Sequence, residues 1–128
     1  MGKVKIDIND TVFSRLVRHR ANWKCERCTM TKRMGDASLH ASHFIGRGNH
    51  RVRYCFDNVD ALCYGCHQFF ETHKQTFYTE FKIKKIGQER YDALIEQSKT
   101  GVIITKALLK PLRAEWRKEL REKYGDHV

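Results

Sequence analysis

Two C-x-x-C pairs constrain this chain more than any other feature of its sequence. "CERC" supplies Cys25 and Cys28, and "CYGC" supplies Cys63 and Cys66. In a reducing compartment two such pairs predict a tetrahedral zinc site, because each pair presents two thiolates and four complete the coordination. A disulfide pair or a redox C-x-x-C would account for one pair and not for two. We therefore expect a structural zinc and a fold that brings the two pairs together.

The expected compartment is the cytosol, where thiols stay reduced. The chain begins with "MGKVKIDIND", which is charged and lacks the apolar run of a signal peptide, and no run long and apolar enough for a membrane span follows. The fifth cysteine, Cys55, stands outside the two pairs, and we interpret it as a small buried side chain.

A strong excess of positive charge narrows the choice of partner. The 128 residues carry a formal net charge of +10. Such a balance favours a polyanion, nucleic acid first, and the alternative is a basic surface that only keeps the protein soluble. We expect no membrane partner, because no lone basic amphipathic arm is visible.

Hydrophobic periodicity predicts helices at both ends of the chain and a hairpin between them. The first helix is predicted to begin with Asn9 or Asp10 as N-cap. "SLHASHFI" and "RVRYCF" have the composition of two strands, and "GRGNH" resembles the turn between them. Helical segments follow the second cysteine pair, and Gly101 separates the last two. We predict one α+β domain, 1–128, made of an N-terminal helix, a zinc-stabilised core and C-terminal helices at 1–22, 23–80 and 81–128.

Three polar residues of the central part are placed where they can meet. His43 ends the first predicted strand, Asn58 follows the second, and His67 comes directly after Cys66 at a helix start. A strand, a strand and a helix can bring these side chains to one point, and the zinc would hold the helix start in place. The sequence therefore predicts a functional site here.

The elements "CERC", "ASHFIGR", "DN" and "CYGCH", in this order, resemble HNH endonucleases of the ββα-metal fold. The resemblance is to small phage-type members with a four-cysteine zinc site, and it covers about residues 23 to 73. It implies a small ββα-metal core flanked by N-terminal and C-terminal helices, and a phage or prophage origin.

The resemblance also implies a role for each of the three polar residues. His43 would be the general base that deprotonates the attacking water. Asn58 would hold the loop and orient that base. His67 would bind a catalytic divalent ion, Mg²⁺, Mn²⁺ or similar, which stabilises the developing charge on the phosphate.

One position departs from the pattern of that family. Many members carry Asp or His directly before the base as a second metal ligand, whereas this chain has Ser42, a poor ligand. His40 and His73 are our candidates to replace it, and Glu71 is a third. The alternative for each is an exposed polar side chain.

The predicted function is that of a metal-dependent HNH DNA endonuclease, a hydrolase of phosphodiester bonds that nicks duplex DNA with low sequence specificity. Arg47, Arg51 and Arg53 lie in the predicted hairpin, and phosphate binding is their predicted role, with plain surface charge as the alternative.

Two other functions stay open at this point. One is a zinc-stabilised DNA-binding module with weak or no catalysis, which Ser42 favours. The other is a nuclease that resolves branched DNA in recombination. DNA is the expected partner in each case, and a second copy of the chain or phage packaging or recombination proteins are further candidates. The expected location is the cytoplasm of a bacterial or phage-infected cell.

Overall fold

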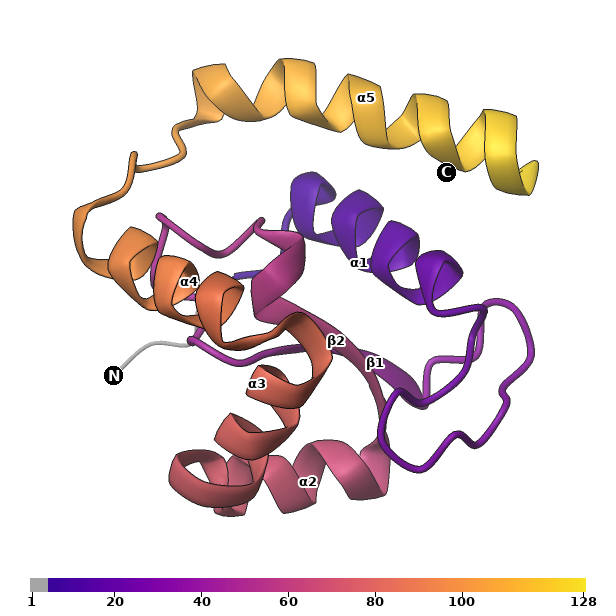
Figure 1. Ribbon diagram of the computed structural model, residues 1–128. Coiled ribbons are helices and arrows are strands. Elements are labelled where there is room, and N and C mark those ends of the chain that lie inside the picture. The colour runs from indigo at the N-terminus through magenta and orange to yellow at the C-terminus, as the bar shows by residue number, and fades with distance from the viewer. Residues whose placement is uncertain (1–4) are drawn as a thin grey trace.

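The computed structural model describes residues 5–128, in which helix α1 lies between a small sheet and helix α5, and helix α2 lies beyond the sheet (Figure 1). The sheet consists of β1 (Leu39–His43) and β2 (Val59–Cys63). The helices α1 to α5 span Ile8–Arg20, Tyr64–Thr72, Thr79–Ile86, Gln88–Thr100 and Lys106–Tyr124. Helices and a sheet in this arrangement confirm the α+β class for the described part of the chain.

Helix α1 begins earlier than its sequence suggested. Asp7 is the N-cap, and its carboxylate accepts a hydrogen bond from the N–H of Asp10 at 3.1 Å. The Asp10 carboxylate accepts one in return from the N–H of Asp7 at 2.9 Å. This reciprocal pair satisfies two N–H groups that a helix start leaves without partners. The predicted caps, Asn9 and Asp10, are therefore wrong, because both lie inside the first turn.

The two strands pair antiparallel, with His43 opposite Val59. The first strand lies where it was predicted, but the second was placed wrongly. Residues 51–56 form turns closed by hydrogen bonds to the carbonyls of Asn49 and Val52, and the strand begins only after them. All five residues of β2 are buried, so its sequence lacks the alternation that marks a half-buried strand.

The helices after the sheet follow the predicted segments with one break. A π-helical turn at Lys74–Tyr78 divides the first predicted helix into α2 and α3. Gly87, at a φ of 87°, ends α3 and begins α4, and this left-handed conformation favours glycine. Gly101 separates α4 from α5 as predicted. None of the helices in residues 5–128 is both long and apolar enough to cross a bilayer.

The core is centred on α1. Phe13 meets Trp116 of α5 and Phe56, with ring centroids 5.0 and 4.7 Å apart. Val12 and Leu16 of the same helix have no exposed surface. Burying a side chain of this size contributes roughly 1.5–3 kcal/mol. Packing on both sides thus holds α1 firmly beside β1.

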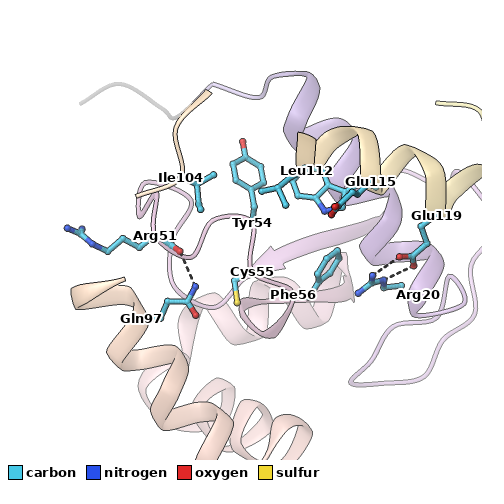
Figure 2. A pocket seen from close by; sticks show the side chains of 11 residues that line it. Arg20, Arg51, Tyr54, Cys55, Phe56, Gln97, Ile104, Leu112, Glu115 and Glu119 are labelled. Atoms are coloured by element: carbon cyan, nitrogen blue, oxygen red, sulfur yellow. Dashed lines mark hydrogen bonds and ion pairs between the residues drawn. The ribbon is translucent and has the colours of Figure 1, made fainter. Parts of the chain in front are cut away.

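A cavity of about 370 Å³ lies between α4, α5 and residues 51–56 (Figure 2). Cys55 lies in its wall, partly buried as expected, and burial raises the pKa of its thiol. Arg20 donates two hydrogen bonds to Glu119 at one end of the cavity, at 2.7 and 2.9 Å. None of the predicted site histidines lines this cavity, so it belongs to the packing of α5 against the core.

Candidate metal centre and basic groove

The four cysteines of the two pairs form one cluster. Cys25 and Cys28 follow α1, Cys63 ends β2, and Cys66 lies in the first turn of α2. Their four sulfur atoms all lie within 4.8 Å of one another, and those of Cys28 and Cys63 are 3.7 Å apart. Four thiolates around a tetrahedral zinc would stand about 3.8 Å apart. The cluster can therefore hold a structural zinc, as the spacing predicted.

The thiols of the cluster differ in their pKa, which is lowered for Cys25 and raised for Cys28 and Cys66. Burial would raise the pKa of Cys25, but backbone N–H donors, including those of Arg27 and Cys28, lower it to about 7. Burial raises the pKa of Cys66 to about 12. Thiolates this close repel one another, and a divalent cation removes that repulsion because metal ligation deprotonates thiols.

Hydrogen bonds fasten the first cysteine pair to the sheet. The N–H of Glu26 donates to the carbonyl of Ala61 at 2.8 Å, and the Glu26 carboxylate accepts from the N–H of Ala61 at 2.7 Å. The pair is thus fixed to the middle of β2. Because β2 also leads directly into α2, the cluster determines where α2 begins.

A groove of about 420 Å³ runs between α1 and β1, and three histidines line it. His40 and His43 belong to β1 and His67 to α2. The Nδ1 atoms of His40 and His67 are 2.9 Å apart. Two nitrogens bound at right angles to one ion at about 2.1 Å would stand about 3.0 Å apart. Burial lowers the pKa of both rings, which favours the neutral form that binds metals.

His43 is held in one orientation. Its Nε2 atom lies 2.9 Å from the carbonyl oxygen of Arg53. A carbonyl can only accept, so Nε2 carries the hydrogen and Nδ1 keeps its lone pair. Burial lowers the pKa of His43 to about 4. The ring is therefore a neutral imidazole at physiological pH.

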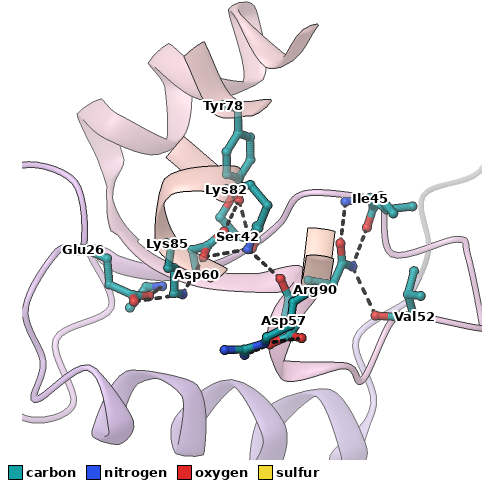
Figure 3. A network of polar contacts seen from close by, with 12 residues as sticks. Glu26, Ser42, Ile45, Val52, Asp57, Asp60, Tyr78, Lys82, Lys85 and Arg90 are labelled. Atoms are coloured by element: carbon teal, nitrogen blue, oxygen red, sulfur yellow. Dashed lines mark hydrogen bonds and ion pairs between the residues drawn. The ribbon is translucent and has the colours of Figure 1, made fainter. Parts of the chain in front are cut away.

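Asn58 lies immediately before β2, not after a strand as predicted, and it is fully buried. Its Oδ1 accepts from the N–H of Ile45 at 2.7 Å, and its Nδ2 donates to the carbonyls of Ile45 and Val52 at 2.9 and 3.1 Å (Figure 3). The side chain thereby joins the end of β1 to the turns before β2, in the segment that contains the Arg53 carbonyl.

Ser42 faces away from the groove, into a buried polar network (Figure 3). Its Oγ is 3.0 Å from the hydroxyl of Tyr78, which donates to Asp60 at 2.8 Å. Asp60 also accepts from Lys82 and Lys85, at 2.8 and 2.6 Å. Burial lowers the pKa of Lys82 and raises that of Tyr78. Ser42 therefore supplies no ligand to the groove.

The candidate second ligands end up in different places. His40 meets His67 as described above. His73 packs between Phe69 and Phe77, with ring centroids 4.7 and 5.4 Å away, and it does not line the groove. A Glu71 carboxylate oxygen lies 3.8 Å from Nε2 of His67. The metal-binding role of each stays a prediction.

The three arginines are also separated. Arg53 is 4% exposed, and its guanidinium donates to the Asp10 carboxylate and to the carbonyl of Lys5. Arg51 donates to the carbonyl of Gly101 at 3.0 Å. Both guanidinium groups thus hold other parts of the chain, and their phosphate-binding role stays a prediction.

Arg47 lines the groove, where its guanidinium lies 3.7 Å from Asp10 and donates to the carbonyl of Lys5 at 3.1 Å. Burial would raise the pKa of Asp10, but the hydrogen bond from Arg53, that from the Asp7 N–H and the nearby arginine charges together lower it. Asp10 is therefore a carboxylate that neutralises part of the positive charge at this end of the groove.

Two further groove residues lie on α1, and the sequence indicated Arg18 only as part of a basic helix whose charges either touch phosphates or form a solvated face. Arg18 and Asp10 both line the groove. For Arg18 a signal was present, because Thr11, Ser14 and Arg18 recur at helical spacing on the side opposite the buried Val12. For Asp10 the sequence held no comparable signal, since its partner Arg53 is distant along the chain.

A family model described as "Bacteriophage Lambda NinG protein" matches residues 4–124. This family is not that of the HNH endonucleases, so our assignment to the HNH family was wrong. The short motifs behind that assignment cover about residues 23 to 73, whereas this match takes in the helices on both sides. No curated protein and no solved structure matches the chain.

Proposed function

The chain belongs to the family of the bacteriophage lambda NinG protein, and we propose that it is a metal-dependent endonuclease that hydrolyses phosphodiester bonds of DNA in the infected cell. The observation that carries the proposal is that His40, His43 and His67 line one groove, in which His40 and His67 are in contact. A net charge of +10 supports a nucleic-acid substrate.

His40 and His67 are the residues that would hold the catalytic ion, since their Nδ1 atoms are 2.9 Å apart and their rings are neutral. A divalent ion at this place supplies Lewis-acid stabilisation of the charge that develops on the phosphate. Two protein nitrogens leave the other coordination positions to water and to the substrate.

His43 acts as the general base. Its Nε2–H is bound to the Arg53 carbonyl, so Nδ1 is the atom that accepts the proton of the attacking water. Asn58 is a positioning residue, because it holds the segment that carries this carbonyl. Arg47 and Arg18 bind the phosphates on either side of the scissile bond.

The supporting framework has the order strand, strand, helix, with the cysteine cluster at the junction of β2 and α2. In this proposal β1, β2 and α2 form a ββα-metal unit, and a structural zinc at the four cysteines keeps His67 at a fixed distance from β1.

The test is nicking of supercoiled plasmid with and without added Mg²⁺ or Mn²⁺, using wild type, His43→Ala and His67→Ala. We expect metal-dependent nicking that falls at least about 100-fold in both variants, since a general base alone contributes about 10²–10⁴-fold. His127→Ala is the matched control, because this histidine is exposed and lies outside the groove, and it should keep its activity.

A DNA-binding module without catalysis is the second candidate, and the position of Ser42 favours it, because Ser42 leaves the groove without a ligand directly before His43. Plasmid binding without nicking in either metal would establish that module and reject the nuclease. A four-way junction cleaved in preference to a linear duplex of the same sequence would identify a nuclease for branched DNA.

A further inference from the structure

Five basic side chains follow one face of α5. Their spacing of four, three, four and four residues repeats with the period of the helix. We call this set the α5 basic face, and it consists of Lys106, Lys110, Arg113, Arg117 and Arg121. It extends over about 22 Å at 1.5 Å per residue.

The acidic residues of α5 lie on its opposite flank. Glu115 and Glu119 line the cavity beside residues 51–56, and Glu119 is paired with Arg20 at the end of α1 (Figure 2). The buried residues Leu109, Trp116 and Leu120 lie between the two flanks. These two glutamates thus lie away from the α5 basic face.

The basic flank contacts α1, the helix that forms one wall of the groove. Arg113 donates to the Oδ1 of Asn9 near the start of α1, at 2.8 Å. Beyond the end of α5, Asp126 forms an ion pair with Arg15. Arg15 is followed one turn later by Arg18, which lines the groove. The basic flank is thus joined to the same helix that supplies Arg18 to the groove.

This arrangement is unfavourable for the isolated protein. Lys106 and Lys110, Arg113 and Arg117, and Arg117 and Arg121 are like charges four residues apart, a spacing that destabilises a helix. In the described part of the chain, Lys106, Lys110 and Arg121 are exposed and form no ion pair within 4 Å. A bound polyanion would remove this repulsion.

We propose that the α5 basic face binds the phosphate backbone of the duplex that flanks the cleavage site. This inference rests on the proposed function and gives the groove a second contact with its substrate. At about 3.4 Å between phosphates along a strand, 22 Å corresponds to about six phosphates. Backbone contacts of this kind add affinity without sequence preference.

The test compares Lys106→Gln/Lys110→Gln with Lys84→Gln/Lys99→Gln, which removes two exposed lysines from α3 and α4. Arg113 and Arg117 are left unchanged because they hold Asn9 and Val128. Binding to a 24-base-pair duplex is measured from 50 to 300 mM salt in a His67→Ala background without added divalent metal, so that cleavage does not interfere.

We expect the Lys106→Gln/Lys110→Gln variant to bind the duplex about tenfold more weakly for each lost phosphate contact near 0.1 M salt. The slope of log affinity against log salt concentration should become less steep by about 1.8, because two contacts are lost. The Lys84→Gln/Lys99→Gln control should keep the affinity and the salt slope of the protein with all its lysines. Equal slopes in the two variants would overturn the inference, while nicking by wild type would leave the proposed function standing. Absence of duplex binding by the His67→Ala protein with its lysines intact would also overturn the inference, whereas the proposed function is decided by the nicking assay on wild type.

Discussion

At the scale of single residues, the geometry of the groove depends on side chains whose orientation is set by particular hydrogen-bond partners. His43 has one partner for its Nε2–H, the Arg53 carbonyl, and this partner determines which nitrogen faces the groove. Arg53 is in turn held by Asp10 on the other side. The orientation of the proposed base therefore depends on an ion pair that itself contacts no substrate.

Because the pKa of His43 is low, the protonation state of its ring should not change between pH 8 and 5. Burial lowers the pKa to about 4 from an ordinary value of 6.5, so the folded ring stays neutral between pH 8 and 5. The unfolded chain takes up this proton near pH 6.5, and the folded protein therefore loses stability as the pH falls from 6.5 towards 4. NMR of the ring protons, with free imidazole as reference, should show no midpoint above pH 5. A midpoint between 6 and 7 would contradict the buried, carbonyl-bound ring.

Asn58→Asp should destabilise the protein although the shape is conserved. The carboxylate cannot donate, so the carbonyls of Ile45 and Val52 lose their buried donor. An unsatisfied buried group costs about 1–3 kcal/mol, and we expect a loss of about 3 kcal/mol in the free energy of unfolding in urea. Asn22→Asp, at an exposed position, should change it by less than about 0.5 kcal/mol. Equal effects would show that the amide is not needed.

At the scale of elements, the polar network on one side of the sheet ties the hairpin to the helices after it. Ser42 of β1, Asp60 of β2, Tyr78 of the π-helical turn and Lys82 of α3 meet there (Figure 3). Lys82 also donates to the carbonyl of Asp57 at 2.7 Å. This network holds α3 against the hairpin, and because α2 precedes α3, it restricts the position of His67 as well.

Asp60→Asn should be more harmful than Lys82→Met. Asp60 and Lys82 are both fully buried, and removing the carboxylate leaves Lys82 as a buried cation without a counter-charge, which costs about 3–5 kcal/mol. Removing Lys82 leaves Asp60 with Lys85 and Tyr78, so the loss should be smaller. Urea unfolding at pH 7 measures both. If Lys82→Met destabilised the protein more than Asp60→Asn, Lys85 would not compensate for the lost positive charge of Lys82.

At the scale of the whole molecule, the cysteine cluster joins parts of the chain that are distant in sequence. It connects the end of α1, through Cys25 and Cys28, to the junction of β2 and α2. Helix α1 is packed between the sheet and α5, so the relative positions of α1 and β1, and hence the groove between them, depend on this connection.

Removal of zinc should therefore unfold the hairpin region. We expect one zinc per chain by elemental analysis, and loss of the folded state, seen by circular dichroism, when a strong chelator removes it, since structural zinc contributes on the order of 10 kcal/mol to small zinc domains. Cys28→Ser should lower the zinc content, whereas Cys55→Ser, outside the cluster, should not. A zinc-free protein with an unchanged spectrum would contradict the structural role.

The short motifs of the chain identified local chemistry better than they identified the family. "CERC" and "CYGC" predicted a cluster that the structure contains. The same motifs led to the wrong family, because they describe about residues 23 to 73 and leave out the flanking helices that the matching family includes. The second strand was misplaced for a related reason, since a fully buried run such as "VDALC" has no period that separates it from its surroundings.

By itself, the sequence determined the α+β class, the long helices, the four-cysteine cluster and the excess of positive charge, because spacing, periodicity and composition are properties of neighbouring residues. The tertiary structure decided that Ser42 turns into the core, that Arg53 pairs with Asp10, and that His40 meets His67. The physical reason is that the direction and partner of a side chain depend on packing between segments that are distant in sequence, and here the cluster and the buried ion pairs hold those segments together.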